Sequence, residues 1–205
     1  MITINLDNKT WIPPEDYILI LKGLTEKEYW EFSSEDLKVE YSQGCLFIHS
    51  PASIKHEKIF SFLHRFINDY LEKKDLGELL GSRIAILLPN NGHRPEPDLI
   101  YFLPNSFSID NDAIYVGNPE WIIEIVSKGT ESHDLGEKLS WYQDAKIQEI
   151  WYIYQDPPKL LRYLLGNNNK YSSESIEKGE IAPKRFPEMK INLKWLKEFP
   201  KISDL

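Results

Sequence analysis

One segment, residues 121–154, limits the fold of this chain more than any other. It begins with WIIEIV at residues 121–126, an apolar run with a single acid, which is typical of a strand buried on both faces. A helical pattern follows to about Ala145, and EIWYIY at residues 149–154 predicts a second strand. A strand, a helix and a strand in this order form a parallel pair with a right-handed crossover. We therefore expect an α/β (α+β) protein with a mixed β-sheet flanked by helices.

The first half of the chain predicts an N-terminal helix, a hairpin and a long helix. Residues 25–32 (TEKEYWEF) predict a short helix, with the threonine as N-cap and Glu28 as its capping-box partner. Two apolar runs within residues 37–48 flank the turn SQGC and predict a hairpin. Residues 53–74 carry apolar side chains at helical spacing after a serine N-cap, so we expect an amphipathic helix there.

The remaining segments are shorter. The apolar runs at residues 82–88 and 98–102 predict two more strands, and residues 160–165 predict a strand antiparallel to the one before it. The polar stretch 166–189 contains Gly and Pro and predicts a loop. Residues 191–199 predict a closing helix.

We expect a single domain over residues 25–200, preceded by an extended arm over residues 1–24. A chain of 205 residues can bury a sufficient core without cross-links, and the single cysteine, Cys45, excludes an internal disulfide. The first ten residues lack the basic and apolar parts of a secretion signal. No apolar run approaches the roughly 20 residues needed to span a bilayer. These features predict a cytoplasmic protein with no membrane partner.

The formal net charge of −8 restricts the function. Proteins that hold nucleic acid only through its phosphates carry a basic excess, so a simple DNA-binding module is disfavoured. An enzyme whose acids bind metal ions is not excluded, because such ions reverse the local charge. The basic residues Lys55, Lys58, Arg65, Arg83 and Arg94 are candidates for one face that holds DNA. The first three do not form one helical stripe, which favours an ordinary solvated surface.

Three carboxylates are candidate metal ligands. Glu124 stands inside the apolar strand, where its desolvation must be offset by a partner or a metal. Asp98 opens a predicted strand directly after Pro-Glu-Pro, and Glu40 lies just before the hairpin turn. The alternatives are a strand-end glutamate facing solvent or paired with lysine, a turn aspartate and a solvent-facing hairpin residue. Together, such acids suit Mg²⁺, which prefers hard oxygen ligands.

Asp134 and Lys138 lie four residues apart in the helix that follows Glu124. One interpretation is a surface ion pair worth about 0.2–0.5 kcal/mol. The other is that Lys138 reaches back to Glu124, where it could orient a water or stabilise the charge that develops on a phosphate.

Other reactive residues give weaker signals. The five histidines show no paired zinc spacing, and His56, at the start of the long helix, is either a site residue or a surface histidine. Ser127 lacks a GxSxG context, so nucleophilic catalysis has no support. Neither a Walker loop nor GxGxxG is present.

Three segments together carry a family resemblance: KVEYSQGCLFI, HRPEPDLIYF and the long block WIIEIVSKGTESHDLGEKLSWYQDAKIQEIWYI. They resemble the restriction endonuclease family called Uma-two, a branch of the PD-(D/E)XK nuclease superfamily, over residues 25–196. The resemblance implies a restriction-endonuclease-like fold and phosphodiester hydrolysis that depends on Mg²⁺, with Mn²⁺ as a substitute.

The resemblance also implies roles for individual residues. Asp98 would be the aspartate of the "PD" element, Glu124 the acid of the next strand and Glu40 the upstream acid. The superfamily places a lysine two residues after the strand acid, where this chain has Val126. The resemblance implies that Lys138 supplies this ammonium from the next helix.

These observations predict a metal-dependent endonuclease that acts on nucleic acid, with DNA as the expected substrate. Asp98 and Glu124 would hold the metal, Lys138 and Glu40 would assist, and His56, Ser127 and Asp134 are candidate supporting residues. The alternatives are an inactive nuclease-fold binding module and a metal-dependent hydrolase of small phosphoesters. We also expect a homodimer, with the aromatic residues of EIWYIY and the arm at its two-fold interface.

Overall fold

The structure, a computed structural model, describes residues 4–6, 9–11, 16–33, 37–81, 83–89, 92–110 and 114–205, the first two ranges by their backbone alone. Parts of the predicted N-terminal arm, residues 1–3, 7–8 and 12–15, lie outside the described residues. Within the arm, β1 (Ile4–Leu6) and β2 (Lys9–Trp11) pair antiparallel.

A six-stranded mixed sheet forms the centre of the molecule. Its spatial order is β14-β13-β12-β11-β8-β6, and only β11 and β12 pair in parallel. The strands are β6 (Leu79–Gly81), β8 (Leu99–Tyr101), β11 (Trp121–Val126), β12 (Glu149–Gln155), β13 (Pro158–Leu165) and β14 (Tyr171–Ile176). The predicted strand-helix-strand unit and the antiparallel strand after it are confirmed. The fold is the mixed α+β class that the sequence predicts.

A second sheet of three antiparallel strands, in the order β3-β5-β4, carries the predicted hairpin. It consists of β3 (Ile18–Lys22), β4 (Val39–Ser42) and β5 (Cys45–His49). The hairpin turns at Gln43 and Gly44, whose φ angles of 46° and 80° suit a two-residue turn of the primed type. Because β3 lies before residue 25 and pairs with β5, part of the predicted arm contributes to this sheet.

Local capping signals place the first two helices. Thr25 and Glu28 form the predicted capping box of α1 (Glu26–Phe32), and Ser53 caps α2 (Ile54–Lys73). After β11 the chain forms α3 (Glu131–His133), a π-helical turn (Asp134–Lys138) and α4 (Leu139–Asp144). The short elements α5 (Trp195–Glu198) and a 3₁₀ turn (Ile202–Asp204) end the chain.

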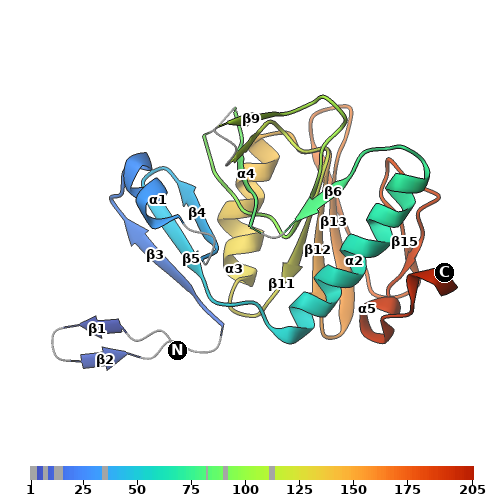
Figure 1. Ribbon diagram of the computed structural model, residues 1–205, viewed down its shortest axis with the longest axis horizontal. Coiled ribbons are helices and arrows are strands. Elements are labelled where there is room, and N and C mark those ends of the chain that lie inside the picture. Colours follow the sequence, from blue (N-terminus) through green and yellow to red (C-terminus); the bar gives the residue numbers. More distant parts are fainter. Residues whose placement is uncertain are drawn as a thin grey trace.

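The central sheet has a different cover on each face (Figure 1). On one face, alternate residues of β11 such as Ile123 and Ile125 pack with the apolar stripe of α2 and with Leu196 of α5. On the other face, Ile122 packs in a cluster that includes Tyr142 of α4 and Phe47 of β5. The segment α3–α4 therefore lies between the central sheet and the hairpin sheet, which brings the hairpin close to β11.

Several predicted elements are wrong in detail. The expected strand at residues 82–88 is only β7 (Ala85–Leu87), which belongs to a separate sheet, β7-β10-β9, with β9 (Ser108–Asp110) and β10 (Ile114–Val116). The predicted loop 166–189 contains β14 and β15 (Glu180–Ile181), and the predicted closing helix is mostly β16 (Ile191–Asn192) and the short α5. β14 escaped prediction because four of its six residues are exposed and polar at an edge of the sheet, so it lacks a buried run.

The predicted interface role of EIWYIY is also wrong. Trp151 and Tyr152 are fully buried, and their strand β12 has hydrogen-bonded neighbours on both sides, β11 and β13. Trp151 and Tyr152 are therefore unavailable to a second copy of the chain, and of the three aromatic residues only Tyr154 is partly exposed. Among the described residues, no helix has the length and apolar character needed to cross a membrane.

Candidate functional site

Strand alternation brings Glu124 and Asp98 to the same face of the central sheet. Glu124 shares its side of β11 with Ile122, which faces α4. The antiparallel register places Ile100 of β8 opposite Ile122, so Asp98, two residues before Ile100, continues the row opposite Glu124. Both carboxylates line one cleft with a volume of about 1070 Å³.

Lys138 lies between two buried acids. Its side chain is fully buried, and Nζ lies 2.6 Å from Glu40 Oε1 and 2.8 Å from Glu124 Oε1. These contacts are close ion pairs rather than aligned hydrogen bonds. The Tyr142 hydroxyl donates a hydrogen bond of 2.5 Å to the same oxygen of Glu124. The π-helical turn that ends at Lys138 thus delivers an ammonium to the strand acid, and such turns occur frequently at functional sites.

Glu40 is the centre of a buried polar network. Its Oε1 receives the Lys138 ammonium and a 3.0 Å hydrogen bond from the backbone N–H of Glu96. Its Oε2 lies 3.0 Å from Nε2 of both His49 and His133. Burial alone would raise the pKa of Glu40, but Lys138 and the two histidines hold that pKa well below its ordinary value. Glu40 is therefore an anion that fixes Lys138.

Asp98 is held by three donors from different elements. Its Oδ2 accepts a 2.7 Å hydrogen bond from the backbone N–H of Ile125 and lies 3.1 Å from His56 Nε2. Its Oδ1 accepts a 2.9 Å hydrogen bond from the Lys38 ammonium. Although burial opposes ionisation, Lys38 and His56 hold the pKa of Asp98 well below its ordinary value.

Two other carboxyl groups of the cluster are harder to ionise. Burial raises the pKa of Glu124 to about 7, with a further contribution from Asp98, and Lys138 only partly offsets this shift. Burial and the neighbouring Glu40 raise the pKa of Glu96 to about 7 as well. Both carboxyl groups therefore hold a proton more readily near neutral pH than a free glutamate does, and a bound cation would favour their ionised form.

The other predicted residues lie nearby with different partners. The side chain of His56 is 14% exposed and contacts Asp98, so it is not a surface histidine. Asp134 accepts a 2.6 Å hydrogen bond from the Thr130 hydroxyl, and burial raises its pKa. The Ser127 hydroxyl donates a 3.0 Å hydrogen bond to Asp16. Both Asp134 and Ser127 line the cleft.

Sequence reasoning missed five residues of the cluster: Lys38, His49, Glu96, His133 and Tyr142. One signal was available for Lys38, because it stands two residues before Glu40 and alternation directs both to the same side of the hairpin strand. The histidines are 84 positions apart (133 − 49 = 84), and this separation gives no recognisable metal spacing.

Two donor sets could hold a metal ion. Asp98 and Glu124 offer carboxylate oxygens at the cleft, and the contacts of Glu124 with the described residues use Oε1, which leaves Oε2 available. This all-oxygen set fits Mg²⁺ or Mn²⁺. The second set is Glu40, His49 and His133, whose ligand atoms lie within 4.8 Å of one another. In this second set the glutamate already has three hydrogen-bond partners and the Lys138 ammonium, so its charge is compensated without an ion.

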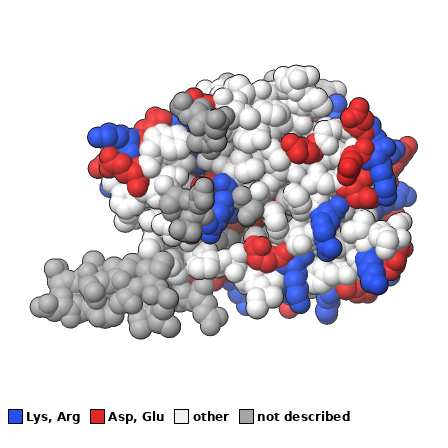
Figure 2. Space-filling view, viewed as in Figure 1, with Lys and Arg blue, Asp and Glu red and all other residues white. Residues whose placement is uncertain are grey.

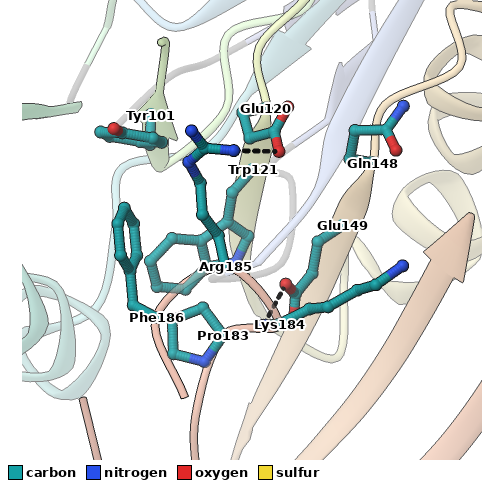
Figure 3. Close-up of a pocket in the computed structure, with 9 residues that line it drawn as sticks. All are labelled: Tyr101, Glu120, Trp121, Gln148, Glu149, Pro183, Lys184, Arg185 and Phe186. Carbon is teal, nitrogen blue, oxygen red and sulfur yellow. Dashed lines mark hydrogen bonds and ion pairs between the residues drawn. The ribbon is translucent and has the colours of Figure 1, made fainter. Parts of the chain in front are cut away.

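A smaller pocket of about 200 Å³ lies at the other end of the strands, where β11 and β12 begin (Figure 3). The acids in it have partners. Glu120 pairs with Arg185 at 3.4 Å, and Glu149 accepts hydrogen bonds from the Trp151 indole and from the backbone N–H of Lys184. Both acids of this pocket therefore have partners, as Glu124 does.

The surface charge agrees with the acidic composition. On the face drawn in Figure 2, acidic and basic side chains are interspersed rather than gathered into one basic stripe. Lys55, one of the predicted surface cations, forms a 3.1 Å ion pair with Asp156 at the edge of the cleft.

Comparisons with known proteins agree with the fold. The family model Uma2, described as "Putative restriction endonuclease", matches residues 25–194. A crystal structure of "a putative nuclease belonging to DUF820" from Anabaena variabilis superposes with a TM-score of 0.70 at 17% identity, covering 84% of this chain and 97% of that chain. A search of curated proteins finds none that matches. At this identity the crystal structure supports the fold alone.

Proposed function

The chain belongs to the Uma2 family, described as "Putative restriction endonuclease", and from this membership we propose that it is a Mg²⁺-dependent endonuclease that hydrolyses phosphodiester bonds of DNA. The observation that carries the proposal is the convergence of Asp98 and Glu124 on one face of the sheet at a large cleft, with Lys138 buried behind Glu124. Carboxylates at a cleft with a buried ammonium behind them are suited to hold a divalent cation against a phosphodiester.

Asp98 and Glu124 would hold the ion. A bound Mg²⁺ or Mn²⁺ lowers the pKa of a coordinated water and polarises a phosphoryl oxygen. His56 and the backbone N–H of Ile125 orient Asp98, since both contact its Oδ2. These contacts leave the carboxylate little freedom, which is what a metal ligand requires.

Lys138 would act through Glu124 rather than on the substrate. Its ammonium is fully buried, and it is not among the residues that line the cleft. By fixing Glu124 Oε1, it would leave the second oxygen of this carboxylate for the metal. Glu40 in turn fixes Lys138, so both are proposed positioning residues.

A second candidate, an inactive nuclease-fold binding module, is favoured by the burial of Lys138 and the net charge of −8. A hydrolase of small phosphoesters would use the same carboxylates. Substrate assays separate the three, because only the endonuclease cleaves polymeric DNA.

The decisive experiment incubates pure protein with supercoiled plasmid, single-stranded DNA, RNA and a chromogenic phosphodiester, each with Mg²⁺, Mn²⁺ or EDTA. We expect nicking or linearisation of DNA with either metal and none with EDTA. Asp98→Asn and Glu124→Gln should each abolish cleavage, whereas Asp156→Asn, an exposed acid of the same cleft, should retain it. DNA cleavage that survives both site substitutions would refute the site.

We further propose that the active form is a homodimer, since two sites are needed to cut both strands of one duplex in a single event. The division into an arm (1–24) and one nuclease-like domain (25–200) is part of the same proposal. Light scattering at several concentrations tests the dimer, and a mass that stays at one chain contradicts it.

A further inference from the structure

Two lysines reach the acid cluster, but they differ in access. Lys138 is fully buried between Glu40 and Glu124. Lys38 stands just before β4, its side chain is 23% exposed, and it lines the cleft. A molecule in the cleft can therefore touch Lys38, while Lys138 stays behind the carboxylates.

Lys38 also contacts the oxygen that a metal ion would need. The other oxygen of Asp98, Oδ2, already has the Ile125 backbone N–H at 2.7 Å and His56 Nε2 at 3.1 Å. This leaves Oδ1 as the oxygen for a metal, and the Lys38 ammonium donates to it at 2.9 Å. An ammonium and a divalent ion on the same oxygen would repel each other strongly, so they compete for it.

We propose that Lys38 is an exchangeable cation: it neutralises Asp98 when no divalent ion is bound, and an ion that binds Asp98 displaces its ammonium into the cleft, where it contacts a phosphate of the substrate. The inference rests on the proposed function, because it takes Asp98 as a metal ligand. The flexible four-carbon stem allows the ammonium to move while the backbone before β4 stays in place.

Measuring metal affinity tests whether a divalent ion displaces Lys38 from Asp98, and it does not require the protein to cleave DNA. We would titrate the full-length protein with Mn²⁺ alone and follow free Mn²⁺ by electron paramagnetic resonance. Lys38→Met should bind Mn²⁺ about tenfold more tightly than the wild type, because it removes a positive charge in contact with the ligand oxygen. The matched control is Lys128→Met, which removes an exposed lysine of the same cleft and should change affinity by less than about twofold.

The gain in Mn²⁺ affinity caused by Lys38→Met should require the carboxylate of Asp98. In Asp98→Asn, adding Lys38→Met should produce no gain in Mn²⁺ affinity. Equal affinities of Lys38→Met and Lys128→Met, or a gain that persists without Asp98, would overturn the exchange. Lys38→Gln, which keeps a polar side chain, provides a second variant, and thermal unfolding verifies that each variant is folded.

The proposed contact between the displaced Lys38 ammonium and a substrate phosphate is tested by the binding of a short single-stranded oligonucleotide at saturating Ca²⁺. Lys38→Met should weaken binding of this oligonucleotide severalfold, and an unchanged affinity would overturn this contact. The outcome is separable from the proposed function. If the protein cleaves DNA but Lys38→Met has unaltered Mn²⁺ affinity, only the exchange fails. If the affinity gain is found but no DNA is cleaved under any condition, only the endonuclease fails.

Discussion

Lys138 Nζ lies 2.8 Å from Glu124 Oε1, so the ammonium paired with the strand acid comes from the following helix. Val126, two residues beyond Glu124 on the strand, instead packs in the apolar cluster below α4. The strand beyond Glu124 therefore stays apolar. Because Lys138 is fully buried between two acids, it has a structural role as well as the proposed functional one.

Removing Lys138 should destabilise the protein strongly. Lys138→Met leaves Glu40 and Glu124 buried without their shared cation, and breaking a buried pair costs about 3–5 kcal/mol. Urea unfolding measures the loss. The double variant Glu40→Gln/Lys138→Met should recover part of it, because one uncompensated charge is removed. The control Lys128→Met, at an exposed position, should change stability by less than about 0.5 kcal/mol. A stable Lys138→Met protein would contradict the ion-pair network.

Divalent metal should raise the melting temperature through Asp98. An ion present at about 100 times its Kd stabilises the folded state by roughly 2.7 kcal/mol. For a chain of this size, this corresponds to an increase of roughly 5–10 °C, measurable by calorimetry. Asp98→Asn should lose most of the shift, whereas Asp156→Asn should keep it, because Asp156 is exposed and paired with Lys55. A shift of equal size in both variants would show that the ion binds elsewhere.

Glu96 should make stability depend on pH. Its folded pKa of about 7 exceeds the ordinary value of 4.5, so the folded state holds this proton more tightly than the unfolded chain does. The stability that Glu96 provides is therefore complete below about pH 4.5 and is lost as the pH rises through 7. Glu96→Gln should match the wild type at low pH and exceed its stability by on the order of 2–3 kcal/mol at pH 8. Urea unfolding at several pH values measures this difference, and a difference independent of pH would contradict it.

Gly81 of β6 should be intolerant of any side chain. A Cβ at this position would overlap the backbone oxygen of Asp98 and lie 2.8 Å from side-chain atoms of Leu99 and Phe60. Gly81→Ala should therefore destabilise the protein by about 1–3 kcal/mol and weaken metal binding by shifting Asp98. Gly136 is the matched control, since its Cβ would meet no atom within 4 Å. Gly136→Ala should retain or slightly increase stability in chemical denaturation, as expected for a helical position. Equal stability of the two variants would argue against the contact with Asp98.

Much of the fold was predictable because its signals are local. The capping box at Thr25, the N-cap at Ser53 and the apolar run of β11 each depend on residues within a few positions, and all three are confirmed. The secondary-structure predictions fail where the local pattern of apolar residues is weak. Polar β14 and the two-residue strand β16 exist only because neighbouring strands offer hydrogen bonds to them.

The sequence by itself determined which acids stand in apolar surroundings, and so drew attention to Glu124 and Asp98. Only the tertiary structure decided their partners. Lys38 lies 60 positions from Asp98, and His133 lies 93 positions from Glu40. Such contacts depend on strand register and on how the hairpin sheet packs against α3–α4. Sequence periodicity indicates which face of a helix or strand is buried. Which charged side chain contacts a buried acid on that face depends on how distant elements pack together.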